Sequence, residues 1–247
     1  MNCHNGEKFL FESLKSVVSQ TYSNWELIFW DNCSTDRSTQ ILKEFSDKRI
    51  KYFYSKKYTK LYAARNLALK KAKGNFISFL DTDDIWHKNK LKKQVELFYK
   101  KNCSATYTNY YIKNEKKNFK YLFEKKKLPN GYIAQNLLDK YCIGILTAMI
   151  KKNVLNQFKF NNRYQIIGDF DFFVRLSQKY KFYCLQEPLA IYRFHGQNLF
   201  HLKIGLYLKE MKFWFKKNKS NLKRYNLKNI KFLIFKLEIK NMIRKLF

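Results

Sequence analysis

Two short, mostly apolar segments that each run into an acidic residue constrain the fold of this chain more than any other feature. Residues 25–30 lead to Asp31, and residues 76–80 lead to Asp81. Strands with so little polar character are typical of a sheet that is covered by helices on both faces, as parallel sheets are. The sequence therefore predicts an α/β protein with a mainly parallel sheet.

The segments around these strands show the helical patterns that such a sheet requires. Residues 7–19 and 61–73 carry apolar residues at helical spacing, and another helix is expected to begin near Asp169. Residues 50–54 and 189–194 are further candidate strands. In open α/β sheets, ligands bind beyond the carboxyl ends of the strands. The acids that follow the strands are therefore candidate site residues.

A formal net charge of +31 is the strongest signal in the composition. It favours anionic partners such as acidic lipid surfaces, nucleotides or nucleic acid. Of the 50 basic residues only eight are Arg, and the chain holds no known nucleic-acid-binding motif, so we expect no nucleic-acid partner. Abundant Lys, Asn, Tyr, Phe and Ile are also what an AT-rich genome produces, so charge alone does not identify the partner.

The five cysteines indicate a reducing compartment. Their number is odd, and they show neither a CxxC pair nor zinc-ligand spacing, so we interpret them as reduced thiols. The first residues are polar and lack the apolar core of a signal peptide. No apolar run approaches the roughly 18 residues that a membrane helix needs. We therefore expect a cytoplasmic protein.

Asp81-Thr82-Asp83-Asp84 is the strongest local signal for chemistry. Mg²⁺ is usually bound through one or two carboxylates together with phosphate oxygens and water, so carboxylates two residues apart at a strand end are suited to hold a metal–diphosphate. The same acids could instead cap the helix that follows them. A phosphohydrolase that uses Asp81 as nucleophile and Asp83 as acid is another interpretation.

Four other residues could take part in chemistry, and each has a structural alternative. Asp31 could accept hydrogen bonds from a base or ribose, or it could cap the next helix. Asp169 could take a proton from a hydroxyl, or it could be an N-cap. His195 could bind a metal or phosphate and Arg65 could neutralise phosphate, although isolated His and Arg residues often serve packing or lie on the surface.

The order of these motifs resembles that of family 2 of the inverting glycosyltransferases, which have the GT-A fold. The resemblance covers about residues 1–200. It implies one Rossmann-like, mainly parallel sheet flanked by helices, with residues 1–110 as the nucleotide-sugar-binding half and residues 111–200 as the acceptor half. The matching blocks are His4–Glu7, Trp25–Asp36, Ala63–Asn66, Phe79–Trp86, Gly168–Asp171 and Tyr192–His195.

The resemblance implies an enzyme of the hexosyltransferase type. It would move a sugar from a nucleoside-diphosphate sugar, most often a UDP-sugar, to an acceptor hydroxyl, with inversion at the anomeric carbon. Asp169 would be the general base, and Asp83 and His195 would bind Mg²⁺ or Mn²⁺. The nucleotide would be bound by His4, Asn5, Glu7, Asp31, Arg65 and Asp81.

The acceptor that the resemblance implies is a glycan or lipid-linked glycan in the synthesis of lipopolysaccharide or another bacterial surface polysaccharide. Residues 201–247 follow the matching region and carry fourteen Lys or Arg against two Glu, interleaved with apolar residues. We expect a basic amphipathic helical tail. It would either cap the domain or dock on the anionic inner face of the cytoplasmic membrane.

The beginning of the chain departs from the family pattern. Family members usually have a hydrophobic strand before the block at His4, whereas here the chain starts at that block. A late start codon or a truncated gene would explain the difference. Loss of a central strand would leave backbone groups unpaired and remove one wall of the base pocket. An inactive relative that acts as an interaction protein is therefore the alternative to an active enzyme.

Overall fold

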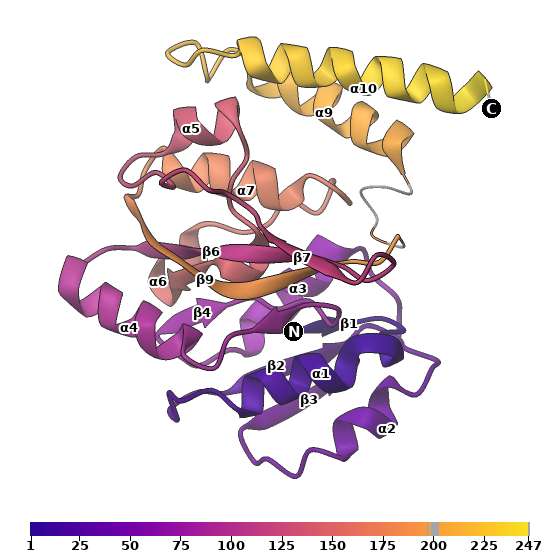
Figure 1. Ribbon diagram of the computed structural model, residues 1–247, viewed down its shortest axis with the longest axis vertical. Coiled ribbons are helices and arrows are strands. Elements are labelled where there is room, and N and C mark those ends of the chain that lie inside the picture. The colour runs from indigo at the N-terminus through magenta and orange to yellow at the C-terminus, as the bar shows by residue number, and fades with distance from the viewer. Residues whose placement is uncertain (197, 199–202, 247) are drawn as a thin grey trace.

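We call the two strands that lead to Asp31 and Asp81 the acid-ending strands. The first of them lies in a small parallel sheet. A computed structural model describes residues 1–196, 198 and 203–246. The elements of its first part are β1 (Asn2–Cys3), α1 (Glu7–Val18), β2 (Leu27–Asp31), α2 (Ser38–Lys43), β3 (Ile50–Tyr54) and α3 (Leu61–Lys71). β2 is buried along its whole length and pairs in parallel with β1 on one side and β3 on the other. Figure 1 shows α1 and α2 against this sheet.

The second acid-ending strand belongs to a six-stranded sheet. Its strands are β4 (Phe76–Ser78), β5 (Ile85–Trp86), β6 (Ala105–Asn114), β7 (Phe119–Leu122), β8 (Met149–Lys151) and β9 (Phe182–Phe194). The strand order is β4-β8-β6-β9-β5, with β7 paired to β6. β6 and β9 run parallel and the other ladders are antiparallel. A parallel bridge between Asn2 and Asp81 joins the two sheets, so both acid-ending strands finish at one edge.

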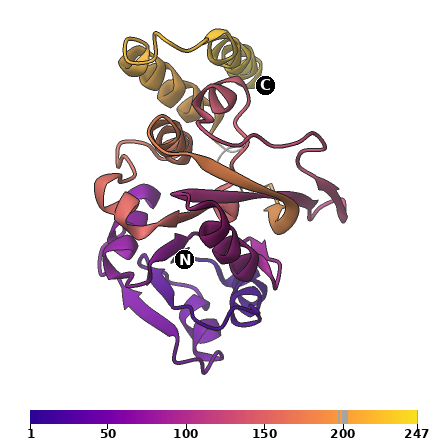
Figure 2. The same cartoon turned by 90° about the vertical axis from the view of Figure 1, so that its left-hand side faces the viewer.

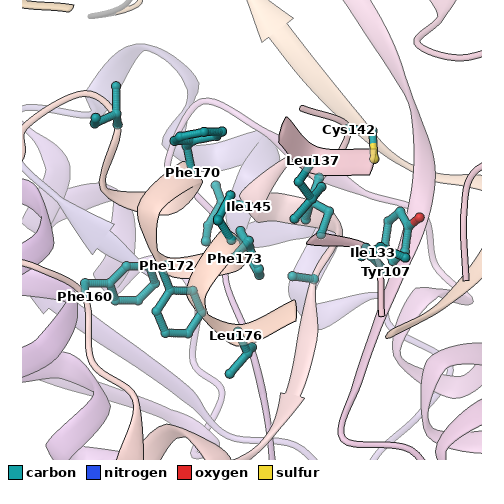
Figure 3. Close-up of a cluster of buried hydrophobic side chains, with 14 of the residues drawn as sticks. Tyr107, Ile133, Leu137, Cys142, Ile145, Phe160, Phe170, Phe172, Phe173 and Leu176 are labelled. Atoms are coloured by element: carbon teal, nitrogen blue, oxygen red, sulfur yellow. The ribbon is translucent and has the colours of Figure 1, made fainter. Parts of the chain in front are cut away.

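The largest hydrophobic core lies beside the second sheet. The helices of this part are α4 (Lys90–Lys101), α5 (Ala134–Asp139), α6 (Lys152–Gln157) and α7 (Gly168–Ser177), with a 3₁₀ turn at Ile145–Thr147. Phe172 and Phe173 of α7 are fully buried, and each such ring contributes roughly 1.5–3 kcal/mol by leaving water. The Phe172 ring stacks on Phe160 with centroids 4.3 Å apart. Figure 3 shows this cluster, which fixes α7 against the sheet.

The α/β class predicted from the sequence is confirmed, and several elements were not predicted. The helices at residues 7–19 and 61–73 and the strand at residues 50–54 are present. β6 was not predicted, because polar residues alternate with aromatic ones along it and it has no apolar run. The lysine-rich segment of residues 114–127 contains β7, three of whose four residues are exposed.

The predicted helical tail is confirmed and consists of two helices, α9 (Ile204–Asn218) and α10 (Lys228–Leu246). They lie side by side over α5 and α7 in both views (Figures 1 and 2). The side chain of Trp214 is 1% exposed, and its Nε1 donates a hydrogen bond to Asp171 at 3.0 Å. The Glu210 carboxylate accepts hydrogen bonds from the backbone N–H groups of residues 165–167. α9 therefore shares the core of the preceding residues.

The boundary near residue 200 between a domain and a tail stays a prediction. Residues 201 and 202, where the tail was expected to begin, lie outside the described residues. Within the described ranges, no helix is both long enough and apolar enough to cross a membrane.

A cavity lies beside the first residues of the chain. Asn2 and Cys3 form β1, between β2 and the segment that follows β4. The ammonium group of Met1 donates a hydrogen bond to the Ile28 carbonyl at 2.9 Å, and burial lowers the pKa of this amine to about 5. Beyond Met1 lies a cavity of about 500 Å³ with Leu27 and Phe76 among its lining residues. The described part of the chain places no strand in this space.

Candidate active site

A cleft of about 920 Å³ opens where the two acid-ending strands finish. One wall is formed by the loops after β2 and β4 together with α3, and the first turn of α7 adds to the lining next to α3. Residues of α9 and α10 close a further side. Of the residues predicted to form the site, those that line the cleft are His4, Arg65, Asp81, Asp83 and Asp169.

Arg65 and Asp81 form an ion pair at the base of the cleft. Nη2 of Arg65 lies 2.6 Å and 2.7 Å from the two carboxylate oxygens of Asp81. The Arg65 side chain is 4% exposed and that of Asp81 is 31% exposed. The guanidinium also lies 5.4 Å from the centroid of the Tyr62 ring, one turn earlier on α3. The pair thus holds one carboxylate of the acidic motif in a fixed position.

Asp83 contacts His195, the other residue that was predicted to bind a metal. The His195 Nε2 atom lies 2.9 Å from Oδ2 of Asp83, although the two residues are 112 positions apart in the chain. The backbone N–H of His195 donates to Asn198 Oδ1 at 3.0 Å, which holds the segment after β9. Among the described residues, the buried Nδ1 atom of His195 has no hydrogen-bond partner.

Asp84 has a structural role beside these groups. Its side chain is buried and accepts a hydrogen bond from the backbone N–H of Arg193 at 3.0 Å. Burial, and then the negative charges of Asp83 and Asp81, raise the pKa of the Asp84 carboxyl well above its ordinary value. The next helix, α4, begins at Lys90 with Asn89 at its N-cap, so none of the three acids caps it.

The residues around Asp83 suit a cation that arrives with a nucleotide. Within the residues that the structure describes, no group of three or more His, Cys, Asp or Glu side chains could hold a metal by itself. Asp83 and His195 offer two ligands next to each other. Mg²⁺ commonly takes its remaining ligands from phosphate oxygens and water, so this donor set fits a metal–diphosphate.

Asp169 lies in the first turn of α7 and is half-buried at the cleft. Its Oδ1 accepts hydrogen bonds from the Phe170 backbone N–H at 2.8 Å and from the Tyr62 hydroxyl at 3.3 Å. Burial raises the pKa of this carboxyl, and the nearby charge of Arg65 opposes the rise. A Cβ on the preceding residue, Gly168, would lie 2.4 Å from the Tyr62 ring, so this close packing requires glycine. Asp169 is therefore an ionisable group held toward the cleft.

His4 lines the cleft and Asp31 does not. The His4 ring packs against Tyr58 with centroids 4.6 Å apart, and its Nδ1 lies 3.0 Å from the Asn32 carbonyl oxygen. Asp31 is fully buried. Its carboxylate accepts hydrogen bonds from the Ser34 backbone N–H at 2.9 Å and from the hydroxyl groups of Thr39 and Tyr52 at 3.2 Å and 2.9 Å. These contacts stabilise the turn after β2, but they do not cap α2, whose N-cap is Arg37.

Asn5 and Glu7 support the loop after β2 and do not line the cleft. Asn5 Oδ1 accepts a hydrogen bond from the Thr35 backbone N–H at 2.8 Å. Glu7 Oε2 accepts one from the Arg37 backbone N–H at 2.9 Å. Any effect of these two side chains on a bound nucleotide would therefore pass through the loop.

Among the cleft residues that were not predicted from the sequence, Tyr62 and Asn32 contact predicted ones. Tyr62 joins Asp169 to Arg65, and its position three residues before Arg65 on one face of α3 is the only sequence signal for it. Asn32 lines the cleft while its amide side chain exchanges hydrogen bonds with Thr59. Neither residue type has a chemical signature that singles it out in a sequence.

The sequence matches the family described as glycosyl transferase family 2 over residues 1–159. The chain belongs to this family. It is 41% identical over 160 residues to the UDP-Glc:alpha-D-GlcNAc-diphosphoundecaprenol beta-1,3-glucosyltransferase WfgD of Escherichia coli, a match that covers 65% of this chain and 62% of WfgD. It is 31% identical over 193 residues to TuaG of Bacillus subtilis, a protein named for teichuronic acid biosynthesis, covering 77% of this chain and 75% of TuaG. The chain thus spans less than two thirds of WfgD.

Solved structures confirm the predicted GT-A fold for this family 2 glycosyltransferase. S. aureus TarS 1-349 matches with a TM-score of 0.68 and 19% identity, over 86% of this chain and 62% of TarS. The complex of TarS 1-349 with UDP matches with a TM-score of 0.64. The mannosyltransferase PcManGT of Pyrobaculum calidifontis, in complex with GDP-Man and Mn²⁺, matches with a TM-score of 0.66 and 14% identity, over 88% of this chain and 62% of PcManGT.

Proposed function

We propose that this chain is a metal-dependent inverting glycosyltransferase that moves a sugar from a nucleoside-diphosphate sugar to an acceptor hydroxyl. The observation that carries the proposal is that one cleft holds the Arg65–Asp81 pair, the Asp83 carboxylate in contact with His195, and the ionisable Asp169. Together these groups offer a cation for phosphate, ligands for a metal, and a base.

The donor binds, on this proposal, along the wall formed by the loops after β2 and β4. His4 and Asn32 border the nucleoside end, and Arg65 and Asp83 border the diphosphate. UDP is the nucleotide we propose, since the name of WfgD specifies UDP-Glc and TarS has been solved with UDP. Asp31, Asn5 and Glu7 shape this wall through the loop that they hold.

Mg²⁺ or Mn²⁺ is the cofactor we propose, with Asp83 and His195 as its ligands from the protein. When bound, the cation supplies positive charge that stabilises the departing nucleoside diphosphate. Arg65 keeps Asp81 in place through both of its oxygens and leaves Asp83 as the carboxylate free to accept the cation. The presence of Mn²⁺ in the PcManGT complex supports this assignment.

Asp169 is the general base of the proposed reaction. Its carboxylate takes the proton from the acceptor hydroxyl while that oxygen attacks the anomeric carbon and the bond to the diphosphate breaks. A single displacement of this kind inverts the anomeric centre. The hydrogen bonds from Tyr62 and from the Phe170 backbone N–H orient the carboxylate, and burial brings its pKa closer to neutral pH, where a base works best.

The acceptor we propose is a lipid-linked sugar of a bacterial surface polysaccharide, used at the cytoplasmic face of the membrane. The names of WfgD, which specifies a diphosphoundecaprenol-linked acceptor, and of TuaG support this class of acceptor.

A phosphohydrolase fits the site less well. Such an enzyme would need Asp81 as a nucleophile, but both of its carboxylate oxygens are bound by Arg65. An inactive relative remains the alternative outcome of the experiment that follows.

The test is the melting temperature of the protein with UDP, dTDP, GDP and CDP, each with and without Mn²⁺. One nucleotide with metal should raise it by about 5–10 °C at a concentration near 100 times its Kd. Asp83→Ala should lose the shift, whereas Glu96→Ala, an exposed acid on α4, should keep it. No shift with any nucleotide in the folded protein would refute the donor site. Retention of anomeric configuration in the product, read by NMR, would refute the inverting mechanism.

A further inference from the structure

α10 carries apolar side chains on two opposite faces. Ile230 and Leu237 point into the core and are 2% and 5% exposed. A helix turns 100° per residue, and the outward face therefore gathers a second apolar set. We call this set the outer stripe, and its members, all at least 42% exposed, are Phe232, Phe235, Ile239, Met242 and Ile243.

Exposed lysines flank the outer stripe. At 100° per residue, Lys231 lies on one side of it and Lys236 and Lys240 lie on the other, and all three are exposed. The Lys236 Nζ atom lies 4.3 Å from the centroid of the Phe232 ring, so the charge sits directly beside the apolar surface. An apolar face bordered by basic residues is the pattern of a helix that lies in the interface of a membrane.

The outer stripe borders the candidate active site. Phe232 and Lys236 line the same cleft as Asp83 and Asp169. A surface that binds along the outer stripe would therefore lie next to the cleft. On the proposed function, an acceptor held in that surface would lie beside the cleft that Asp169 lines.

We propose that the outer stripe docks α10 in the plane of an anionic lipid bilayer and so turns the cleft toward membrane-borne acceptors. The docking is argued from α10 alone; only the role of the acceptor rests on the proposed function. The apolar side chains enter the boundary between headgroups and acyl chains, and the lysines bind the anionic headgroups.

Charge favours a lipid surface over the other partners that could cover the outer stripe. A second copy of this chain would bring the same lysines together, and each copy carries a net charge of +31. Nucleic acid would satisfy the lysines but would leave the aliphatic residues Ile239 and Met242 in water. An anionic bilayer satisfies both the charges and the apolar side chains.

The experiment is co-sedimentation of the full chain with vesicles of phosphatidylcholine alone or mixed with phosphatidylglycerol, without donor or acceptor. We expect binding to the mixed vesicles to be at least about tenfold stronger than to phosphatidylcholine alone. Phe235→Ser/Ile239→Ser/Met242→Ser should lower binding to the mixed vesicles by at least about tenfold. Lys231→Glu/Lys240→Glu should abolish the preference for the anionic lipid. Lys43→Glu/Lys48→Glu, with the same change in net charge on exposed residues of the opposite end, should bind like the unmodified protein.

Three outcomes would overturn the docking proposal. The first is that the triple serine variant binds the mixed vesicles as strongly as the unmodified chain. The second is that Lys43→Glu/Lys48→Glu lowers vesicle binding as much as Lys231→Glu/Lys240→Glu does. The third is that light scattering shows a dimer of the unmodified chain and a monomer of the serine variant. The melting temperature of each variant without nucleotide, compared with that of the unmodified protein, checks its fold. Because vesicle binding is measured without substrate, it can succeed when the proposed transfer reaction fails, and the reverse. If both the docking and the transfer reaction are confirmed, the serine variant should lose transfer to a lipid-linked acceptor in vesicles and keep transfer to a short water-soluble acceptor.

Discussion

The donor side of the cleft and the outer face of α10 differ in whether charged and apolar side chains have partners within the protein. On the donor side the Arg65 and Asp81 charges are paired. The ring of Tyr62 is buried between the groups that it positions. On α10 the apolar side chains of Phe235 and Met242 are 55% and 65% exposed, next to lysines in solvent. On the donor side the charges have partners within the molecule, whereas on α10 the apolar side chains are exposed, as the proposed docking on a lipid surface requires.

This contrast divides the effects of substitutions into two kinds. Changes on the donor side should alter chemistry or the free energy of unfolding, since they remove partners from buried groups. Changes on the outer stripe should alter binding to a surface and leave folding and chemistry almost unchanged. A substitution on the outer stripe that altered folding or chemistry, or one on the donor side that altered only surface binding, would contradict this distinction.

The largest effect is expected for Asp169→Asn. An amide cannot take the proton, so kcat should fall by about 10²–10⁴, while the nucleotide-induced melting shift should remain. Asp171→Asn is the matched control two residues along α7. It weakens contacts with Trp214 and Arg175 and should lower stability more than kcat. A kcat for Asp169→Asn close to that of the unmodified protein would remove Asp169 from the mechanism.

The pH dependence of the reaction sharpens the same prediction. The pKa of Asp169 is raised by burial, and the base must be deprotonated, so kcat should fall on the acid side at a pH above the ordinary value of 3.8. The raised pKa means that the folded state holds this proton more tightly than the unfolded state. The contribution of Asp169 to stability is therefore greatest below its unfolded pKa and decreases as the pH rises through its folded pKa.

A smaller but substantial effect is expected for Arg65→Gln. It leaves the Asp81 carboxylate at the base of the cleft without its cation, and the free energy of unfolding should fall by about 3 kcal/mol in urea denaturation. Arg49→Gln is the comparison, because Arg49 pairs with Asp47 nearer the surface, where a pair contributes at most about 1 kcal/mol. Adding Asp81→Asn to Arg65→Gln should restore part of the loss. Equal losses for Arg65→Gln and Arg49→Gln would contradict the distinction between the two pairs.

The cavity of about 500 Å³ next to Met1 is an exception on the donor side, because the described residues leave this space unfilled. An added Val-Ile-Val-Ile segment before Met1 could pair with Leu27 and Ile28 and fill that space. Each kcal/mol so gained should raise the melting temperature by about 2–4 °C. A Gly-Ser-Gly-Ser segment of equal length is the control, and equal melting temperatures for the two extended proteins would show that a strand does not enter the cavity.

The sequence predicted the parts of this molecule whose signal is local. The two acid-ending strands were recognisable because burial on both faces leaves few polar residues in them. β6 was not recognisable, because its buried polar residues have partners outside the strand. Thr106 accepts a hydrogen bond from Gln94, and Asn109 donates one to the Glu124 carbonyl. The contact between Asp83 and His195 followed only from the family resemblance, because no spacing rule connects residues 112 positions apart.

Asp31 shows the opposite case, in which a residue at the expected place has a partner set that the sequence does not reveal. Its position after β2 suggested contact with a nucleotide. The structure surrounds it with Thr39, Tyr52 and the Ser34 backbone, and Tyr52 comes from β3, a separate strand that only the fold brings close. The position of a residue along a strand is thus predictable from the sequence, but the hydrogen-bond partners of its carboxylate are not.

The smallest effect is expected within α10 itself, for Ile239→Ser. Ile239 is 42% exposed on the outer stripe, so the free energy of unfolding should change by less than about 0.5 kcal/mol. Leu237→Ser, two residues earlier on the opposite face and 5% exposed, should instead cost about 2–5 kcal/mol, because it removes apolar contacts from the core and buries a hydroxyl. Urea denaturation of both variants measures the difference. If Ile239→Ser destabilised the chain as much as Leu237→Ser, both faces of α10 would belong to the core and the contrast between α10 and the donor side would disappear.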